Sequence, residues 1–170
     1  MKVIDNFLEE EYFNKLSNLV CSTNYEFPWY YGPYYLSTLD DEDDPLQYFF
    51  THLVYLNDVP ISSHYDPLCQ ELLGAIDAKG EGIKSLMRIR ANYFPNTKSL
   101  HEYSMHTDME FSHTAAVLSL NTCDGYTKLA DGTKVDSVEN RIIFFDAGEA
   151  HCSTTTSNKK ARFNIIVNYL

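Results

Sequence analysis

The sequence predicts a mainly β chain of the α+β kind, in which helices come first and a jelly roll follows. Three observations lead to this prediction. Two stretches of the first half have helical periodicity, and from residue 83 onward short apolar runs alternate with turn signals. Aromatic residues make up 14% of the chain, with 13 Tyr and 10 Phe, and such side chains favour strands. We expect the helices to cover one sheet of the jelly roll.

The helical stretches of the first half are residues 5–20 and a segment that begins near residue 66. In the first, apolar residues recur near helical spacing, which predicts an amphipathic helix; they are Phe7, Leu8, Tyr12, Phe13, Leu16, Leu19 and Val20. In the second, Asp66 suits an N-cap and Pro67 the first helical position. Leu68, Leu72, Leu73 and Ile76 continue this helix, and Gly80 and Gly82 end it.

The predicted strands are short and apolar. Residues 46–56 are rich in aromatics and form the first of them. The others are Leu86–Phe94, Ala115–Leu120, Arg141–Phe145 and Phe163–Tyr169. Turn signals separate them, at residues 95–96, 124–125, 131–132, 147–148 and 157–158. Several short strands with frequent turns are typical of a sandwich or barrel.

Composition limits the classes of function. The formal net charge is −11, with 13 basic and 24 acidic residues, so nucleic-acid binding is not expected. The four cysteines show no paired spacing and are interpreted as free thiols of a reducing compartment. We find no signal peptide and no apolar span, and therefore expect no membrane association and a cytoplasmic location. Residues 1–170 are expected to form one domain, with 1–82 supporting a jelly-roll core at 83–170.

Two segments of unusual composition each have two interpretations. The acidic run 40–44 is interpreted as a solvated surface loop, with a lid or a partner-docking segment as the alternative. The aromatic stretch 25–35 is interpreted as core or edge packing. Its alternative is a wall of the substrate cleft, because aromatic rings bind peptides and proline well.

The candidate metal ligands are sought among six histidines, two of which have an aspartate two residues later: His64 with Asp66, and His106 with Asp108. Asp66 already has a role as helix cap, which sets the first pair aside. His106 and Asp108 end a plausible strand that starts at His101, and on a strand residues two apart share a face. They are the firmer pair.

His151 is the candidate third ligand. It follows the core strand at 141–145 and a turn at 146–148. Two histidines and one carboxylate on one face of a metal leave open positions, an arrangement that suits non-haem Fe(II) oxygenases. Arg162 stands 11 residues later at the head of an apolar strand. An arginine among apolar side chains is costly unless an anion meets it, and a carboxylate fits its planar guanidinium; the alternative is a surface arginine at a strand end.

The order of these features resembles the Fe(II)/2-oxoglutarate-dependent dioxygenases with the double-stranded β-helix, or cupin-like, fold. The resemblance is nearest to the prolyl-4-hydroxylase-like branch, which includes small members encoded by phages, and it covers residues 85–170. The matching segments are 90–95 (RANYFP), 103–108 (YSMHTD), 116–121 (AVLSLN), 124–127 (DGYT), 140–145 (NRIIFF), 151–155 (HCSTT) and 159–163 (KKARF).

The resemblance implies a role for each matching residue. His106, Asp108 and His151 would ligate iron, and Arg162 would bind the far carboxylate of 2-oxoglutarate. Tyr93 would hydrogen-bond that carboxylate, with aromatic core packing as its alternative, and Tyr103 would lie at the cavity wall. The resemblance also implies Fe(II), 2-oxoglutarate and O2, with ascorbate as a further candidate cofactor.

Three functions compete at this point. The first is a hydroxylase that acts on a C–H bond, peptidyl proline included, and releases succinate and CO2; its substrate is a peptide, a protein or a small molecule. The second is a non-catalytic, cupin-like module that binds a metal or small molecule, which leaves Arg162 unexplained. The third is a zinc hydrolase, which is disfavoured because no separate general base stands near the ligands.

Overall fold

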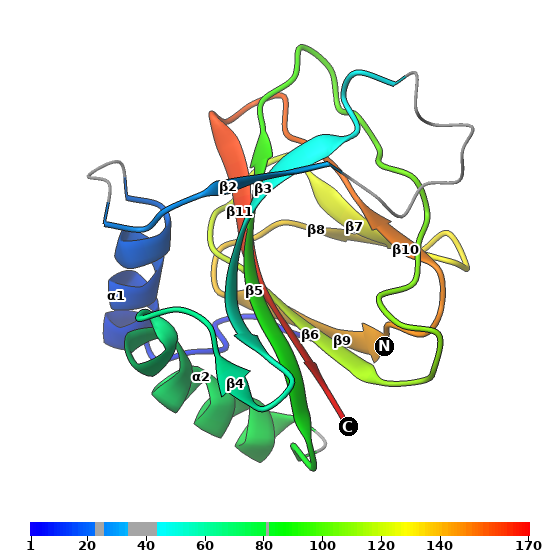
Figure 1. Ribbon diagram of the computed structural model, residues 1–170. Helices are drawn as coiled ribbons and strands as arrows, with labels where there is room; N and C mark the ends of the chain where they lie inside the picture. The colour runs from blue at the N-terminus through cyan, green and yellow to red at the C-terminus, as the bar shows by residue number, and fades with distance from the viewer. Residues whose placement is uncertain (23–25, 34–43, 81) are drawn as a thin grey trace.

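Two antiparallel sheets form the body of the protein in the computed structural model, which describes residues 1–22, 26–33, 44–80 and 82–170 (Figure 1). The elements are β1 (Lys2–Ile4), α1 (Glu10–Val20), β2 (Tyr30–Pro33), β3 (Tyr48–Leu56), β4 (Val59–Pro60), α2 (Tyr65–Lys79), β5 (Leu86–Pro95), β6 (Thr114–Ser119), β7 (Tyr126–Leu129), β8 (Lys134–Asp136), β9 (Arg141–Asp146), β10 (His151–Ser153) and β11 (Ala161–Tyr169).

The large sheet has the order β1-β9-β6-β11-β5-β3-β2, with β4 paired to β3, and the small sheet has the order β10-β7-β8. Neighbouring strands of the large sheet are far apart in sequence, because β11 inserts between β5 and β6. Ile165, for example, lies beside Ala91 on one side and Leu118 on the other. This arrangement of two facing antiparallel sheets confirms the predicted jelly roll.

Alternation along the strands divides the core into two layers. In β6, Ala116 and Leu118 pack in the layer beneath the helices, whereas Ala115 and Val117 pack in the layer between the sheets. Successive side chains of a strand point to opposite faces, so a strand that is buried on both faces is apolar throughout. That requirement explains the continuous apolar runs of the sequence.

Helices α1 and α2 cover one face of the large sheet, as predicted (Figure 1). Leu16 and Val20 of α1 and Leu72 and Ile76 of α2 are buried there with Ile89 of β5. No helix in the described part of the chain is long and apolar enough to cross a membrane.

The first helix begins later than the sequence predicts, and the second begins earlier. The first starts at Glu10, not near residue 5, because residues 2–4 pair with β9. The second has His64, not Asp66, as its N-cap, so Asp66 lies within the first turn and makes no side-chain cap. The Ser62 hydroxyl instead accepts a hydrogen bond from the His64 backbone N–H (3.1 Å). Asp66 and Pro67 remain compatible with a first turn, where an acid is favourable and N–H groups lack helical partners.

The aromatic stretch is described at residues 26–33. Phe27 is buried, and Trp29 packs against Tyr93 and Phe163 at ring-centroid distances of 5.7 and 5.8 Å. These contacts favour the packing interpretation for the two residues. Tyr25 and residues 34–35 lie outside the described residues, as do positions 40–43 of the acidic run.

Asn140 joins the N-terminal segment to the jelly roll. Its side chain accepts a hydrogen bond from the Leu8 N–H (2.9 Å) and donates one to the Leu8 carbonyl (2.8 Å). Its backbone φ of 57° lies in the left-handed region, which asparagine tolerates better than most residues. This one residue therefore satisfies two buried backbone groups and shapes the turn before β9.

We expect Asn140→Ala to lower the free energy of unfolding by about 2–4 kcal/mol, from two lost buried hydrogen bonds and left-handed strain. Urea denaturation measures it. Asn140→Gly is the matched control: it removes the same bonds but not the backbone preference, so it should cost about 1 kcal/mol less. Equal stability of Asn140→Ala and the parent chain would contradict this account.

Candidate metal centre

His106 and His151 face each other across an isolated β-bridge. The His106 N–H donates to the His151 carbonyl, and the His151 N–H donates to the His106 carbonyl, both at 2.9 Å. In such a pair the two side chains lie on the same face of the ladder. Their ring centroids are 4.5 Å apart. His151 is the first residue of β10, near the position that the sequence predicts.

The segment that carries His106 and Asp108 is not the strand that the sequence predicts. Between β5 and β6 the chain forms only isolated bridges, at Asn96, Glu102 and His106. The Asp108 N–H donates to the Ala147 carbonyl at 3.0 Å, which holds the segment beyond the bridge. The side chains of His106 and Asp108 nevertheless share a face, because backbone hydrogen bonds hold the chain on both sides of Thr107.

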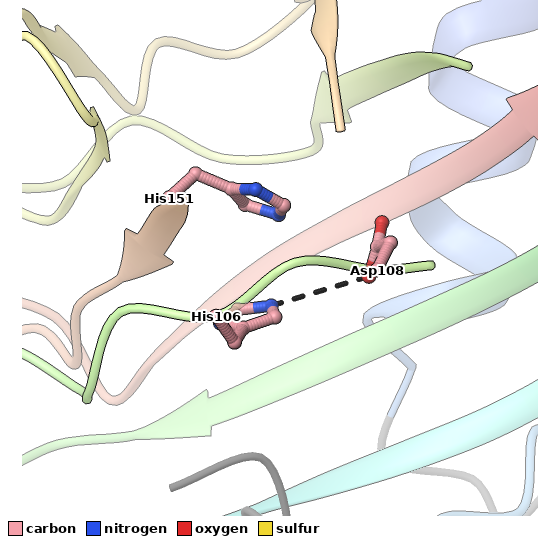
Figure 2. A group of neighbouring side chains, drawn as sticks. All are labelled: His106, Asp108 and His151. Atoms are coloured by element: carbon pink, nitrogen blue, oxygen red, sulfur yellow. Dashed lines mark ion pairs between the residues drawn. The ribbon is translucent and has the colours of Figure 1, made fainter. Parts of the chain in front are cut away.

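One ligand atom from each of His106, Asp108 and His151 lies within 4.8 Å of the others. Figure 2 shows the three side chains pointing toward one another, His151 from β10 and the other two from the loop. His106 Nε2 lies 4.0 Å from a carboxylate oxygen of Asp108. Two imidazole nitrogens and one carboxylate oxygen are a set that suits Fe(II) and other divalent transition metals.

Backbone carbonyls orient both imidazoles. His151 Nδ1 lies 2.9 Å from the Glu149 carbonyl, and His106 Nδ1 lies 3.4 Å from the Ser104 carbonyl. A carbonyl only accepts, so Nδ1 carries the proton in each ring and the lone pair of Nε2 faces the centre. This orientation of a ligand histidine by its second nitrogen is common at metal sites.

Both imidazoles are neutral at physiological pH. Burial and the neighbouring His151 together lower the pKa of His106 to about 4, while Asp108 opposes the shift. Burial also lowers the pKa of His151. A metal therefore meets two rings that need not lose a proton first.

Asp108 is almost fully buried and is held by a polar network. Arg88 lies 2.7 Å from one carboxylate oxygen, and the Asn168 amide donates to the other at 2.8 Å. Arg88 also donates to the Asn168 side-chain oxygen (3.0 Å), and Asn168 contacts His113 at 3.2 Å. Burial alone would raise the pKa of Asp108, but the charges of Arg88 and Arg90 hold it well below its usual value. The carboxylate is therefore ionised and fixed in direction.

A small cavity of about 30 Å³ lies beside these ligands between the two sheets. Strands β5 and β11 form one wall, where side chains at every second position face inward. Besides the ligands, the wall consists of Phe49, Arg90, Asn92, Phe94, Val117, Thr127, Phe145, Ser153, Asn164 and Ile166. Asn92 donates to Asn164 (2.8 Å), and its buried side-chain oxygen has no partner among the described residues.

Arg162 is buried at the end of β11 farthest from Asp108, only 1% exposed. Its guanidinium donates to the Thr154 carbonyl (3.2 Å) and the Thr127 hydroxyl (2.9 Å) and lies over the Phe94 ring at 5.4 Å. These two hydrogen bonds and the ring contact fix the direction of the guanidinium. The surface alternative for Arg162 is wrong.

The structure separates the two tyrosines of the predicted site. Tyr103 is buried against Phe94, with ring centroids 5.6 Å apart, and its hydroxyl donates to the Tyr48 carbonyl (2.7 Å). Tyr93 faces the helices instead and packs on Phe163 at 4.9 Å. The cavity-facing residue is its neighbour Phe94, because one step along a strand reverses the face. The structure therefore does not bring Tyr93 to the site.

Five polar residues near the ligands are absent from the sequence-based prediction, namely Arg88, Arg90, Asn92, Asn164 and Asn168. All have even numbers on β5 or β11. Polar residues at every second position of otherwise apolar strands were the signal that could have found them, since such a pattern marks a polar interior.

We expect His106→Ala and Asp108→Ala to weaken binding of Mn(II) or Co(II) by at least about 100-fold, since even loss of an outer partner costs 10- to 100-fold. Calorimetric titration of the metal-free protein measures this affinity. His113→Gln is the matched control, because His113 contacts Asn168 but offers no ligand; it should lie within about tenfold of the parent. Tight metal binding by both ligand variants would exclude this centre.

Comparisons with known proteins find neither a matching family model nor a matching curated sequence. Solved structures do match. A Pseudomonas putida prolyl-4-hydroxylase is 16% identical, with a TM-score of 0.66, over 99% of this chain and 91% of that one. A Trichoplax adhaerens prolyl hydroxylase, in complex with a peptide fragment of the hypoxia inducible factor oxygen degradation domain, is 13% identical (TM-score 0.71; 99% and 82% covered). A 2OG-Fe(II) oxygenase family oxidoreductase of Burkholderia pseudomallei is 12% identical (TM-score 0.71; 98% and 83% covered). The chain therefore has the fold of the prolyl-4-hydroxylases and other 2OG-Fe(II) oxygenases.

Proposed function

We propose that this protein is an Fe(II)- and 2-oxoglutarate-dependent dioxygenase that hydroxylates a C–H bond and releases succinate and CO2. The observation that supports it best is the placement of two groups at opposite ends of β11. The cluster of His106, Asp108 and His151 lies at the Asn168 end, and the buried guanidinium of Arg162 lies at the other end, against Phe94 and Thr127 of the cavity wall.

The metal end matches the chemistry that Fe(II) requires. His106, Asp108 and His151 would hold the ion and leave its remaining positions for 2-oxoglutarate and O2. When bound, Fe(II) supplies the activation of O2 that drives oxidation of an unactivated C–H bond. The protein's part is to keep the imidazoles neutral, to fix Asp108, and to surround the site with side chains that exclude water.

The far end matches a dicarboxylate. Arg162 would receive the distal carboxylate of 2-oxoglutarate, assisted by the Thr127 hydroxyl on which it already rests. Thr154 orients the guanidinium through its carbonyl, and Phe94 supports its face. Tyr103 lies behind Phe94 and is a supporting residue in this scheme. We do not assign Tyr93 to the co-substrate, because its ring packs on Phe163 and Trp29, on the face of β5 opposite the cavity.

The carboxylate of Asp108 favours hydroxylation over halogenation. Related halogenases have a small residue at this position, which admits a halide to the metal. Here Asp108 is present and held from both sides, by Arg88 and by Asn168. No position for a halide is left at that side of the centre.

The substrate class is suggested by the surroundings. The Trichoplax neighbour was solved with a peptide, which supports a peptide or protein substrate, peptidyl proline included. Met105 and Phe111 flank the two loop ligands and are 38% and 50% exposed, so apolar surface borders the centre. A small-molecule substrate is the alternative.

We expect the purified protein to convert 2-oxoglutarate to succinate in an Fe(II)- and O2-dependent reaction, at least in its slow uncoupled form. His106→Ala and Asp108→Ala should lose this activity, because each removes a ligand. Succinate is measured by chromatography in air and under argon, with ascorbate present. Iron binding without succinate formation would favour the cupin-like binding module, and activity with zinc under argon would favour the hydrolase.

Arg162→Met should raise the KM for 2-oxoglutarate by about 10- to 100-fold, since hydrogen bonds to charged groups contribute roughly 1.5–3 kcal/mol. Affinity for Mn(II) alone should stay unchanged, because Arg162 is not at the metal end. Arg141→Met is the control, since Arg141 pairs with Asp5 outside the cavity. An unchanged KM for 2-oxoglutarate in Arg162→Met would contradict the assignment of Arg162 to the distal carboxylate.

A further inference from the structure

Gly125 lies directly against the stem of Arg162. A β-carbon built on Gly125 would lie 2.7 Å from Arg162 Cδ and 2.6 Å from the Thr155 carbonyl oxygen. Carbon atoms in favourable contact are about 3.5–4.0 Å apart, so a methyl group here would have to displace the arginine stem by roughly 1 Å. The φ of Gly125 is not in the left-handed region, whereas that of Gly132 is 86°. Space, and not backbone conformation, therefore restricts residue 125 to glycine.

The two loops that meet at Gly125 are held by hydrogen bonds on both sides of it. The carboxylate of the preceding residue, Asp124, accepts a hydrogen bond from the Ser157 N–H (2.9 Å). The N–H of the following residue, Tyr126, donates to the Thr154 hydroxyl oxygen (2.9 Å). These bonds resist a movement of the backbone. The arginine stem, which is a chain of single bonds, is therefore the neighbour that gives way most easily to a side chain at residue 125.

A side chain at residue 125 would push the guanidinium toward the cavity. Phe94 and Thr127 contact the guanidinium of Arg162 and also line the cavity. Gly125 and Thr154 contact the same arginine from the loops, and in the described part of the chain neither belongs to the cavity lining. Gly125 therefore supports Arg162 from the side that faces away from the cavity, and the cavity is where the metal ligands lie.

The position of the guanidinium decides which co-substrate fits between it and the metal. A 2-oxo diacid must reach the metal with its oxo acid end and Arg162 with its distal carboxylate. Oxaloacetate is one carbon shorter than 2-oxoglutarate, and 2-oxoadipate is one carbon longer. A shift of the arginine by roughly 1 Å is comparable to a carbon–carbon bond of about 1.5 Å, so it is enough to favour another member of this series.

We propose that Gly125 selects the length of the diacid co-substrate: by leaving room for the stem of Arg162, it sets how far the guanidinium lies from the metal centre. This inference rests on the proposed function and deepens its co-substrate site. Gly125 does not touch the diacid in this scheme. It is a positioning residue that acts through Arg162.

The test uses the full chain loaded with Mn(II) and measures the binding of oxaloacetate, 2-oxoglutarate and 2-oxoadipate by calorimetry. A blank titration into Mn(II) alone corrects for decarboxylation of oxaloacetate. The variants are Gly125→Ala, which pushes the cation toward the metal, and Arg162→Lys, whose shorter side chain draws it back. Gly80→Ala is the matched control, because its β-carbon would be equally crowded, 2.5 Å from the Ile76 carbonyl oxygen, but against helix α2.

We expect the parent chain to bind 2-oxoglutarate at least tenfold more tightly than either of the other acids. In Gly125→Ala the affinity for 2-oxoglutarate should fall at least tenfold, and the preference should move toward oxaloacetate. In Arg162→Lys the preference should move the opposite way, toward 2-oxoadipate. Gly80→Ala should keep the parent's order of the three acids, and the affinity for Mn(II) alone should stay within twofold in every variant.

Four results would overturn the proposal: no length preference in the parent chain, an unchanged order of the acids in Gly125→Ala, an equal loss of all three acids in that variant, or the same change of order in Gly80→Ala. If thermal melting shows that Gly125→Ala does not fold, Arg162→Lys decides, and a preference that does not move toward 2-oxoadipate rejects the proposal. Failure of the parent chain to bind 2-oxoglutarate at all is a separate result, which rejects the proposed function itself.

Discussion

The pairing of β5 with β11 is the constraint on which the site depends. Eight consecutive residue pairs hold the two strands in one register, from Ala161 opposite Pro95 to Asn168 opposite Arg88, and the register shifts only before Tyr169. Odd positions enter the layer under the helices and even positions enter the cavity. A shift of the register by one residue would put Arg90 where Ile89 now lies and bury its charge under the helices. The apolar layer under the helices therefore also fixes which residues face the cavity.

The same pairing explains how a buried carboxylate is kept ionised. An isolated charge in a protein interior is expensive, and it is retained only when it is paired and hydrogen-bonded. Asp108 comes from a loop, but both of its partners, Arg88 and Asn168, come from adjacent positions of the β5–β11 pair. The rigid sheet thus fixes a residue whose own segment has little regular structure.

The fold and the convergence of the three candidate ligands could be predicted from sequence because they depend on local signals. Apolar runs and turn residues predicted the strands. The spacing of two residues between His106 and Asp108 predicted the first two ligands. His151 was placed by the core strand and the turn that precede it, and Arg162 by the strand that it starts.

The missed features depend on distant partners. The N-cap of α2 is His64 and not Asp66, and the β1 strand forms only because β9 accepts it. Tyr93 was assigned to the co-substrate by the resemblance alone, with core packing as its alternative. The polar residues Arg88 and Arg90 stand at even positions of β5, so Tyr93 points to the other face.

The loop between Pro95 and Thr114 is joined to the strands by hydrogen bonds at intervals, among them the three isolated bridges and the Asp108 N–H. Stretches between these ties have exposed side chains, as at residues 98–100 and 110–112. An insertion between two hydrogen-bonded points of such a loop lengthens the exposed stretch and leaves the hydrogen-bonded points in place. A designer who wants a different substrate can therefore insert residues in these spans and keep the ligand geometry intact.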